Sequence, residues 1–239
     1  MHIIQTLIGN QDHSGEFFHQ KNFENLLYDA VHMLYLAHDI DRESDEHGCE
    51  STLVRGSIIN SLLLFECAAN CCIDLLKLRG SYFDDVDKLP FLSKFEFFLN
   101  RVSPALEFDR GCLVVQSVAE LKSLRDGYVH PKVKKKQYAA SDPGCFAVEF
   151  DKTKELGISY DPGQWSRSTA ISAIRTASDF FNLFFLQWCH FDSDTVCGIL
   201  LDSSPATIPA TAAVVIDCVG GLDRAVKDWG VNFKFIGKE

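Results

Sequence analysis

The segment Leu124–Lys132 carries the side chains best suited to chemistry on a phosphate. It reads Leu-Arg-Asp-Gly-Tyr-Val-His-Pro-Lys, with Arg125, Asp126 and His130 close together in the chain. An imidazole titrates near neutral pH and can move protons, and a guanidinium can hold a phosphate and its developing negative charge. Arg125 and His130 are therefore a candidate acid–base and phosphate-binding pair.

The spacing of this pair restricts how the two side chains can meet. Arg125 and His130 are five residues apart, which on a regular helix places them about 140° apart around the axis. Pro131 disfavours the helical conformation of the residue before it, so the helix should end near His130, which could then turn toward Arg125 or face a neighbouring chain. The alternative is structural: Arg125 pairs with Glu66 or Asp74 to neutralise acids of a core helix, and His130 only ends its own helix.

Chance alone would produce such a spacing. Nine arginines and eight histidines in this chain give about one Arg-x(4–6)-His match by chance. A second match, Arg42–His47, lies in an acidic stretch and is interpreted as a decoy, that is, a match without function. The first match differs because it leads into a basic run that opposes the sign of the whole chain. This run either binds phosphate or forms a solvated connection, and its candidate phosphate-binding residues are Lys122, Lys132, Lys134, Lys135 and Lys136.

On these residues the chain resembles the HEPN superfamily of helical-bundle proteins. The signature of that family is an Arg, a polar residue that is often Asn or Asp, about three further residues and a His, late in a bundle helix, and Leu124–His130 matches it. Ser57–Leu76 looks like the long helix of the family, and Leu89–Phe95 looks like a Pro-Lys segment of several members. The resemblance covers about residues 20–190, and Lys132 stands where a subset of members has Tyr.

The resemblance implies a homodimer in which two Arg–His motifs form a metal-independent RNase site without a cofactor. It implies that His130 is the general acid/base for attack of a ribose 2′-hydroxyl on the adjacent phosphate. Arg125 would stabilise the phosphorane-like charge, Asp126 would be the supporting polar residue, and Glu66 could orient Arg125. Such an endoribonuclease could belong to a toxin–antitoxin or defence system with a partner protein encoded nearby. Because other members are non-catalytic, the alternative is a helical module that binds a nucleotide or a protein.

Apolar periodicity places these residues on helices. Glu66, Asn70 and Asp74 step by four along one of them, so they form a polar stripe that needs partners if it faces inward. We expect an all-α fold, an antiparallel bundle of about five helices. The predicted helices span about residues 21–39, 52–79, 91–100, 109–130 and 166–190.

The period changes after the fourth helix. Phe146, Val148 and Phe150 alternate with polar residues, and a second alternation follows at 156–160, which predicts a β-hairpin insert at about 144–160. Beyond residue 192 we expect a C-terminal appendage, with an interrupted helix over 211–229 and a short strand over 231–236. The predicted organisation is thus a helical domain over 1–192 and an appendage over 193–239.

Composition limits the class of protein. With 46% hydrophobic and 23% charged residues, the chain is of ordinary globular type. Its net charge of −10 argues against a protein that coats nucleic acid or an anionic membrane with its whole surface, so an RNA site must be local. Nine cysteines without a C-x-x-C pair or a secretory signal fit a cytoplasmic protein. Glu66 and Asp74 argue against a membrane span at 57–76, because each central acid costs about 2.5–3.5 kcal/mol on insertion.

The acidic stretch Asp39–Glu50 contains the other pattern with a possible chemistry. Its carboxylates and His47 fall at the ligand spacing of an EF-hand loop, but Ser44 stands where the turn of that loop requires Gly. We therefore expect a solvated acidic loop between two helices, and no metal site.

Overall fold

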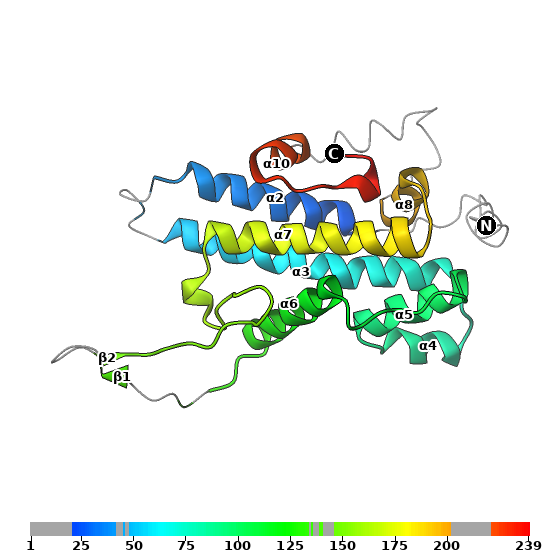
Figure 1. The fold of residues 1–239 in the computed structure, drawn as a ribbon, viewed down its shortest axis with the longest axis horizontal. Coiled ribbons are helices and arrows are strands. Elements are labelled where there is room, and N and C mark those ends of the chain that lie inside the picture. Colours follow the sequence, from blue (N-terminus) through cyan, green and yellow to red (C-terminus); the bar gives the residue numbers. More distant parts are fainter. Residues whose placement is uncertain are drawn as a thin grey trace.

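Eight α-helices are present in the part of the chain that the computed structural model describes, and they share one hydrophobic core (Figure 1). The described residues are 21–41, 45, 48–133, 135, 139–140, 146–201 and 221–239. The prediction of an all-α fold is confirmed. The helices are α2 (Phe23–Asp39), α3 (Cys49–Leu75), α4 (Ser81–Asp87), α5 (Phe91–Val102), α6 (Leu113–Val129), α7 (Arg167–Phe181), α8 (Ser193–Leu200) and α10 (Leu222–Trp229).

Helix α3 lies at the centre and packs against α2, α5, α6 and α7. Its approach to α2 is close: Ser57 Oγ donates a hydrogen bond to the carbonyl oxygen of Ala30 at 2.6 Å, and a Cβ on Gly56 would lie only 2.5 Å from Met33 Sδ. By length and composition α3 could cross a membrane, and 56% of its most apolar window is buried inside the fold. A helix with apolar residues nearly all round is typical of the centre of a bundle.

Phenylalanine rings join α3 to the other core helices. The Phe65 ring lies 5.6 Å from Phe91, 5.5 Å from Phe180 and 5.4 Å from Phe181, measured between ring centroids. The Phe95 ring meets Phe180 edge-on at 4.9 Å. Aromatic pairs in such geometries add about 0.5–1.5 kcal/mol each beyond the area that they bury, so this cluster sets how α5 and α7 sit on α3.

The directions of the helices differ in part from a simple antiparallel bundle. Helix α2 runs against α7, because Phe23 contacts Phe181 at one end and Ile40 accepts a hydrogen bond from Arg167 at the other. Helix α3 runs in the same direction as α7, since Glu50 and Arg167 pair where both helices begin, 2.9 Å apart. The reason is that α6 returns the chain to the end of the bundle where α3 starts (Figure 1).

The C-terminal part of the chain also differs from the expected appendage. Residues 193–201 and 221–239 belong to the same core as the other helices, with Trp229, Phe233 and Phe235 buried. Instead of the strand predicted over 231–236, the chain forms a short 3₁₀-helix, η3 (Lys234–Ile236), and a single bridge. Of the interrupted helix predicted over 211–229, residues 211–220 lie outside the described residues.

Polar side chains of α7, and of the π-helix η2 (Asn182–Trp188) that continues it, hold this segment. Arg175 Nη2 donates to the carbonyl oxygen of Trp229 at 2.6 Å. Ser178 Oγ and Asn182 Nδ2 both donate to the carbonyl oxygen of Asn232. These hydrogen bonds satisfy backbone carbonyl oxygens that would otherwise be buried without a donor. The segment can therefore be buried without joining a sheet.

The predicted hairpin at 144–160 is not formed. The strand residues β2 (Phe146–Ala147) pair with β1 (Ala139–Ala140), upstream of the expected partner, and over 151–160 there is only one bridge, Lys152 with Ser159. The physical reason lies on α6. Glu120 accepts hydrogen bonds from the backbone N–H groups of three successive residues, 154–156, so these donors face the helix and are not available to a ladder.

This contact fixes the loop that follows. The N–H to carboxylate distances at Glu120 are 2.8, 2.8 and 3.0 Å, and the Trp165 indole N–H donates to the carbonyl oxygen of Ser159 at 2.8 Å. Partial burial acts to raise the pKa of the Glu120 carboxyl, but these backbone bonds and the Thr153 hydroxyl outweigh burial and hold the pKa below its usual range. The ionised carboxylate therefore stabilises the folded loop.

We predict that Glu120→Gln lowers the free energy of unfolding by about 1 kcal/mol at pH 7, because the amide keeps one acceptor and loses the charge. A carboxyl whose pKa is lowered by folding stabilises the protein above its unfolded pKa of about 4.3, and this contribution is lost as the pH falls through the folded value. The difference between wild type and variant should therefore shrink in urea unfolding at pH 3.5. The exposed Glu107→Gln is the control; an equal loss in both variants would contradict the assignment.

Candidate functional site

A cavity of about 1030 Å³ lies where α3, the corner between α4 and α5, the end of α6 and the loop at 150–162 meet. Its walls include residues from distant parts of the sequence that were predicted to act together. Six of the predicted site residues line it: Glu66, Lys122, Arg125, Asp126, His130 and Lys132.

Helix α6 positions most of these side chains. The residues Val118, Leu121 and Leu124, each three positions apart, are buried, so the neighbouring positions of the helix face the cavity. The helix ends at Val129, and His130 follows outside helical geometry, with φ −118° and ψ 63°. The predicted end of the helix before Pro131 is thus confirmed, and the imidazole lies on an exposed residue.

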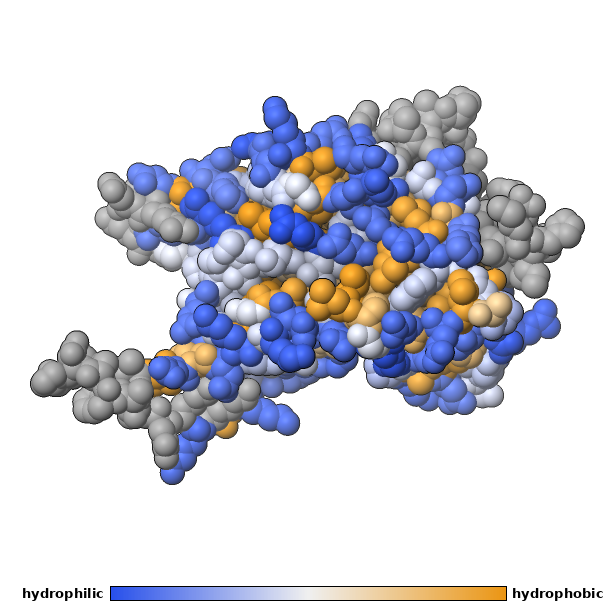
Figure 2. Space-filling model, viewed as in Figure 1, coloured by the Kyte–Doolittle hydropathy of each residue, from blue (hydrophilic) through white to orange (hydrophobic). Residues whose placement is uncertain are grey.

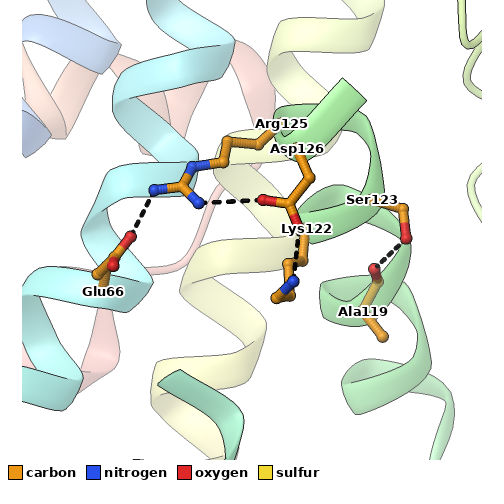
Figure 3. Close-up of polar contacts among 6 residues, drawn as sticks. All are labelled: Glu66, Ala119, Lys122, Ser123, Arg125 and Asp126. Atoms are coloured by element: carbon orange, nitrogen blue, oxygen red, sulfur yellow. Dashed lines mark hydrogen bonds and ion pairs between the residues drawn. The ribbon is translucent and has the colours of Figure 1, made fainter. Parts of the chain in front are cut away.

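Arg125 spans the gap between α6 and α3 (Figure 3). Its Nη2 lies 2.7 Å from Glu66 Oε2 and its Nη1 lies 3.0 Å from Asp126 Oδ1. The second oxygen of Asp126 accepts from Lys122 Nζ at 2.5 Å. The predicted pairing of Arg125 with Glu66 is confirmed, whereas the other candidate partner, Asp74, pairs with Lys77.

This network determines the charge state of Asp126. Partial burial acts to raise the pKa of its carboxyl, but hydrogen bonds from Lys122 and Arg125 outweigh burial, and the pKa lies below its usual range. Asp126 is therefore ionised at neutral pH. It can orient the two cations and cannot donate a proton to a substrate.

The polar stripe of α3 is satisfied along its whole length. The stripe does not face inward, since all three of its members are exposed, yet each of them contacts a cationic side chain. The pairs are Glu66 with Arg125, Asn70 with Lys94, and Asp74 with Lys77.

Lys94 is a cavity residue that the sequence placed in the Pro-Lys segment but not among the candidate site residues. It occupies a buried position of the amphipathic helix α5, and its side chain is only 6% exposed. Its Nζ lies 2.7 Å from Asn70 Oδ1 and 3.1 Å from Asp87 Oδ1. The signal in the sequence was indirect: Lys94 stands among apolar residues, at a position of the helix that faces the core.

The basic run after α6 contributes in part. Lys132 is exposed and lines the cavity, and Lys135 is exposed but is not among the lining residues. Lys134 and Lys136 lie outside the described residues. Among the lining residues that are described, carboxylates are as frequent as lysines and arginines, so an anion that enters must compete with Glu66, Asp126 and others for the cations.

The acidic loop between α2 and α3 has structural roles where it is described. Asp45 accepts hydrogen bonds from the backbone N–H groups of Cys49 and Glu50 at 2.8 and 2.9 Å, and so caps the start of α3. Glu50 pairs with Arg167. The decoy Arg42–His47 lies outside the described residues except for Asp45. Within the described part of the chain, no group of three or more His, Cys, Asp or Glu residues could hold a metal ion.

Comparison of the chain with protein-family models, with curated proteins and with solved structures found no match. Its function is therefore inferred from the geometry of this cavity and the chemistry of its side chains.

Proposed function

We propose that the protein is a cytoplasmic, metal-independent endoribonuclease whose site is formed by Arg125 and His130 at a dimer interface. The observation that supports this proposal best is that both residues of the predicted motif line one cavity, together with Lys122 and Lys132. An exposed imidazole can exchange protons with a substrate, and three cations nearby can bind its phosphate. As part of the proposal, a protein encoded nearby restrains the activity.

The proposed reaction is an internal transesterification. The imidazole of His130 takes the proton of a ribose 2′-hydroxyl, and the oxygen attacks the adjacent phosphorus. The bond from phosphorus to the 5′-oxygen breaks, and the leaving oxygen receives a proton from the histidine of the second copy. The products are a 2′,3′-cyclic phosphate and a 5′-hydroxyl, and no metal-bound water takes part.

Arg125 would stabilise the charge that develops on the phosphoryl oxygens. Its guanidinium presents five N–H donors, and the contacts with Glu66 and Asp126 use only part of them. The ionised Asp126 keeps Arg125 and Lys122 side by side, which holds the donors in place before substrate binds. Holding the groups in this way reduces the reorganisation that the reaction would otherwise need.

The exposed apolar residues at the end of α6 support a second copy at this place. Val129 is 46% exposed, Tyr128 38%, and Val133 fully exposed. They adjoin His130 in the chain, so an isologous contact through them would bring two His130 side chains to one site. On the face seen in Figure 2 hydrophilic residues predominate and apolar residues are exposed in patches.

A non-catalytic binding module is the second candidate. The observation that favours it is that both arms of Arg125 already contact carboxylates, at 2.7 and 3.0 Å. A guanidinium so occupied can serve only to join α6 to α3, since paired charges are not always functional. In that case the cavity would bind a nucleotide or a partner protein without cleavage.

We predict that the wild-type protein cleaves RNA in excess EDTA and that His130→Ala reduces the rate by about 10²–10⁴-fold, the range for loss of a positioned general acid/base. Arg125→Ala should be similarly impaired. Gel analysis and mass spectrometry of the products should find 2′,3′-cyclic phosphate ends. Circular dichroism should show the His130→Ala fold unchanged, because the residue is exposed.

The matched control is His32→Ala, an exposed histidine on α2 that stacks on Tyr28 and does not line the cavity. The decoy variants Arg42→Ala and His47→Ala should also cut normally. Cleavage that requires Mg²⁺, or that survives His130→Ala, would remove the mechanism. Absence of cleavage of any RNA by an intact dimer would favour the binding module.

We also predict that Val129→Glu weakens the dimer, because a charge placed in an apolar contact loses its hydration. A cost of about 2 kcal/mol corresponds to an increase of about 30-fold in the dimer Kd, measurable by light scattering or sedimentation at micromolar concentration. Leu36→Glu is the control, since Leu36 is 42% exposed on α2. A wild-type protein that is monomeric at these concentrations would refute the dimeric site.

A further inference from the structure

The cavity extends beyond the Arg–His pair to the corner between α4 and α5. There it is lined by Lys88, Pro90, Phe91 and Lys94, none of which belongs to the motif or to the basic run. This second region of the cavity has its own cations, Lys88 and Lys94, which favour an anionic ligand.

Lys94 is the central group of this region. Its side chain is 6% exposed, and a buried ammonium must be compensated by acceptors or counter-charges. An ammonium has three N–H donors, and Asn70 Oδ1 and Asp87 Oδ1 account for two of them. The third has no acceptor among the described residues, and the residue lines the cavity.

The first turn of α5 adds to the positive potential beside Lys94. This helix has 12 residues, its first turn carries no acid, and Pro90 before it supplies no side-chain cap. Pro90 and Phe91 line the cavity, so the unpaired N–H groups at this helix start lie at its wall. The start of a helix carries partial positive charge and favours anions.

The distance between the two cationic regions follows from α3. Arg125 contacts Glu66, and Lys94 contacts Asn70. Glu66 and Asn70 are four positions apart on one face of α3. At 1.5 Å per residue, their backbones are about 6 Å apart along the axis. One cavity thus presents two cationic side chains anchored on successive turns of α3.

We propose that Lys94, with Lys88 and the start of α5, binds the phosphate next to the one on which Arg125 and His130 act. The ligand is then a single-stranded RNA segment with at least two phosphodiesters, and this identification rests on the proposed function. Asp87 opposes binding as the counter-charge of Lys94. Its side chain is 54% exposed, so it can turn to water when the phosphate enters.

The test uses 2′-O-methyl oligoribonucleotides, which cannot be cleaved, without terminal phosphates. Isothermal titration calorimetry compares a dinucleotide with one phosphodiester and a trinucleotide with two. The wild type should bind the trinucleotide about tenfold or more tightly than the dinucleotide, as expected for a hydrogen bond between charged groups. In Lys94→Met this advantage should disappear, while dinucleotide binding persists.

A second variant keeps the test informative if Lys94→Met does not fold. Asp87→Asn removes the competing charge and should strengthen trinucleotide binding severalfold, with little effect on the dinucleotide. The matched controls are Asp84→Asn, an exposed acid of α4, and Lys77→Met, an exposed lysine that pairs with Asp74 of the stripe. Neither control residue lines the cavity, so neither should alter the ratio.

The outcomes separate this proposal from the proposed function. A Lys94-dependent trinucleotide advantage in a protein that cleaves no RNA would support the second phosphate site and reject the nuclease. Cleavage with an unchanged ratio in Asp87→Asn and in folded Lys94→Met would reject the second site alone. Inorganic phosphate that binds as tightly as the trinucleotide, with the same dependence on Lys94, would identify a site for a free anion and overturn the assignment to an RNA chain.

Discussion

The central helix α3 must be apolar enough to sit inside the bundle and yet carries Glu66 and Asn70 on one face. That face is exposed, and the buried partner in its contacts is Lys94 of α5, whose ammonium requires acceptors because burial without them costs more than a small domain can lose. Asn70 and Asp87 meet this requirement, and one turn earlier on α3 Glu66 contacts Arg125 of α6. The positions of α5 and α6 relative to α3 are therefore coupled to two polar contacts, and the cavity lies where these contacts are made.

The same contacts give the cavity its chemical character. Arg125 is held by carboxylates on both sides, so two of its N–H donors are in use and the guanidinium is oriented. A phosphate that binds the remaining donors lies close to the two carboxylates, which makes binding a balance between attraction and repulsion. Under the proposed function, this balance would restrict RNA binding on an acidic protein to one place on its surface.

Periodicity predicted the five longer helices because each of them buries a stripe of apolar residues, whereas α4 and α8, of seven and eight residues, were not predicted. The end of α6 near Pro131 was predictable because a proline disfavours the helical conformation of the residue before it. The pairing of Arg125 with Glu66 was one of two predicted alternatives; Glu66 is 48% exposed, so the pair is not buried. The predicted hairpin was wrong because Glu120 accepts hydrogen bonds from the N–H groups of three residues that lie 34 to 36 positions further along the chain. The alternation at 156–160 cannot reveal so distant a contact. Lys94 was noted in the Pro-Lys segment but not as a site residue, because a lysine among phenylalanines is recognisable as a cavity residue only when the neighbours from α3 and α4 are known.

The burial of the C-terminal segment affects how the protein can be made. Phe23 at the start of α2 lies against Phe235, with ring centroids 6.2 Å apart. The ring of Phe181, on α7, contacts both of them. Contacts of such high sequence separation slow folding. On the ribosome, the core around α2 and α7 cannot be completed before residue 236 has emerged. Until then the helices made earlier keep part of their apolar faces exposed to water. Chaperone dependence during synthesis is the expected cellular consequence of this topology.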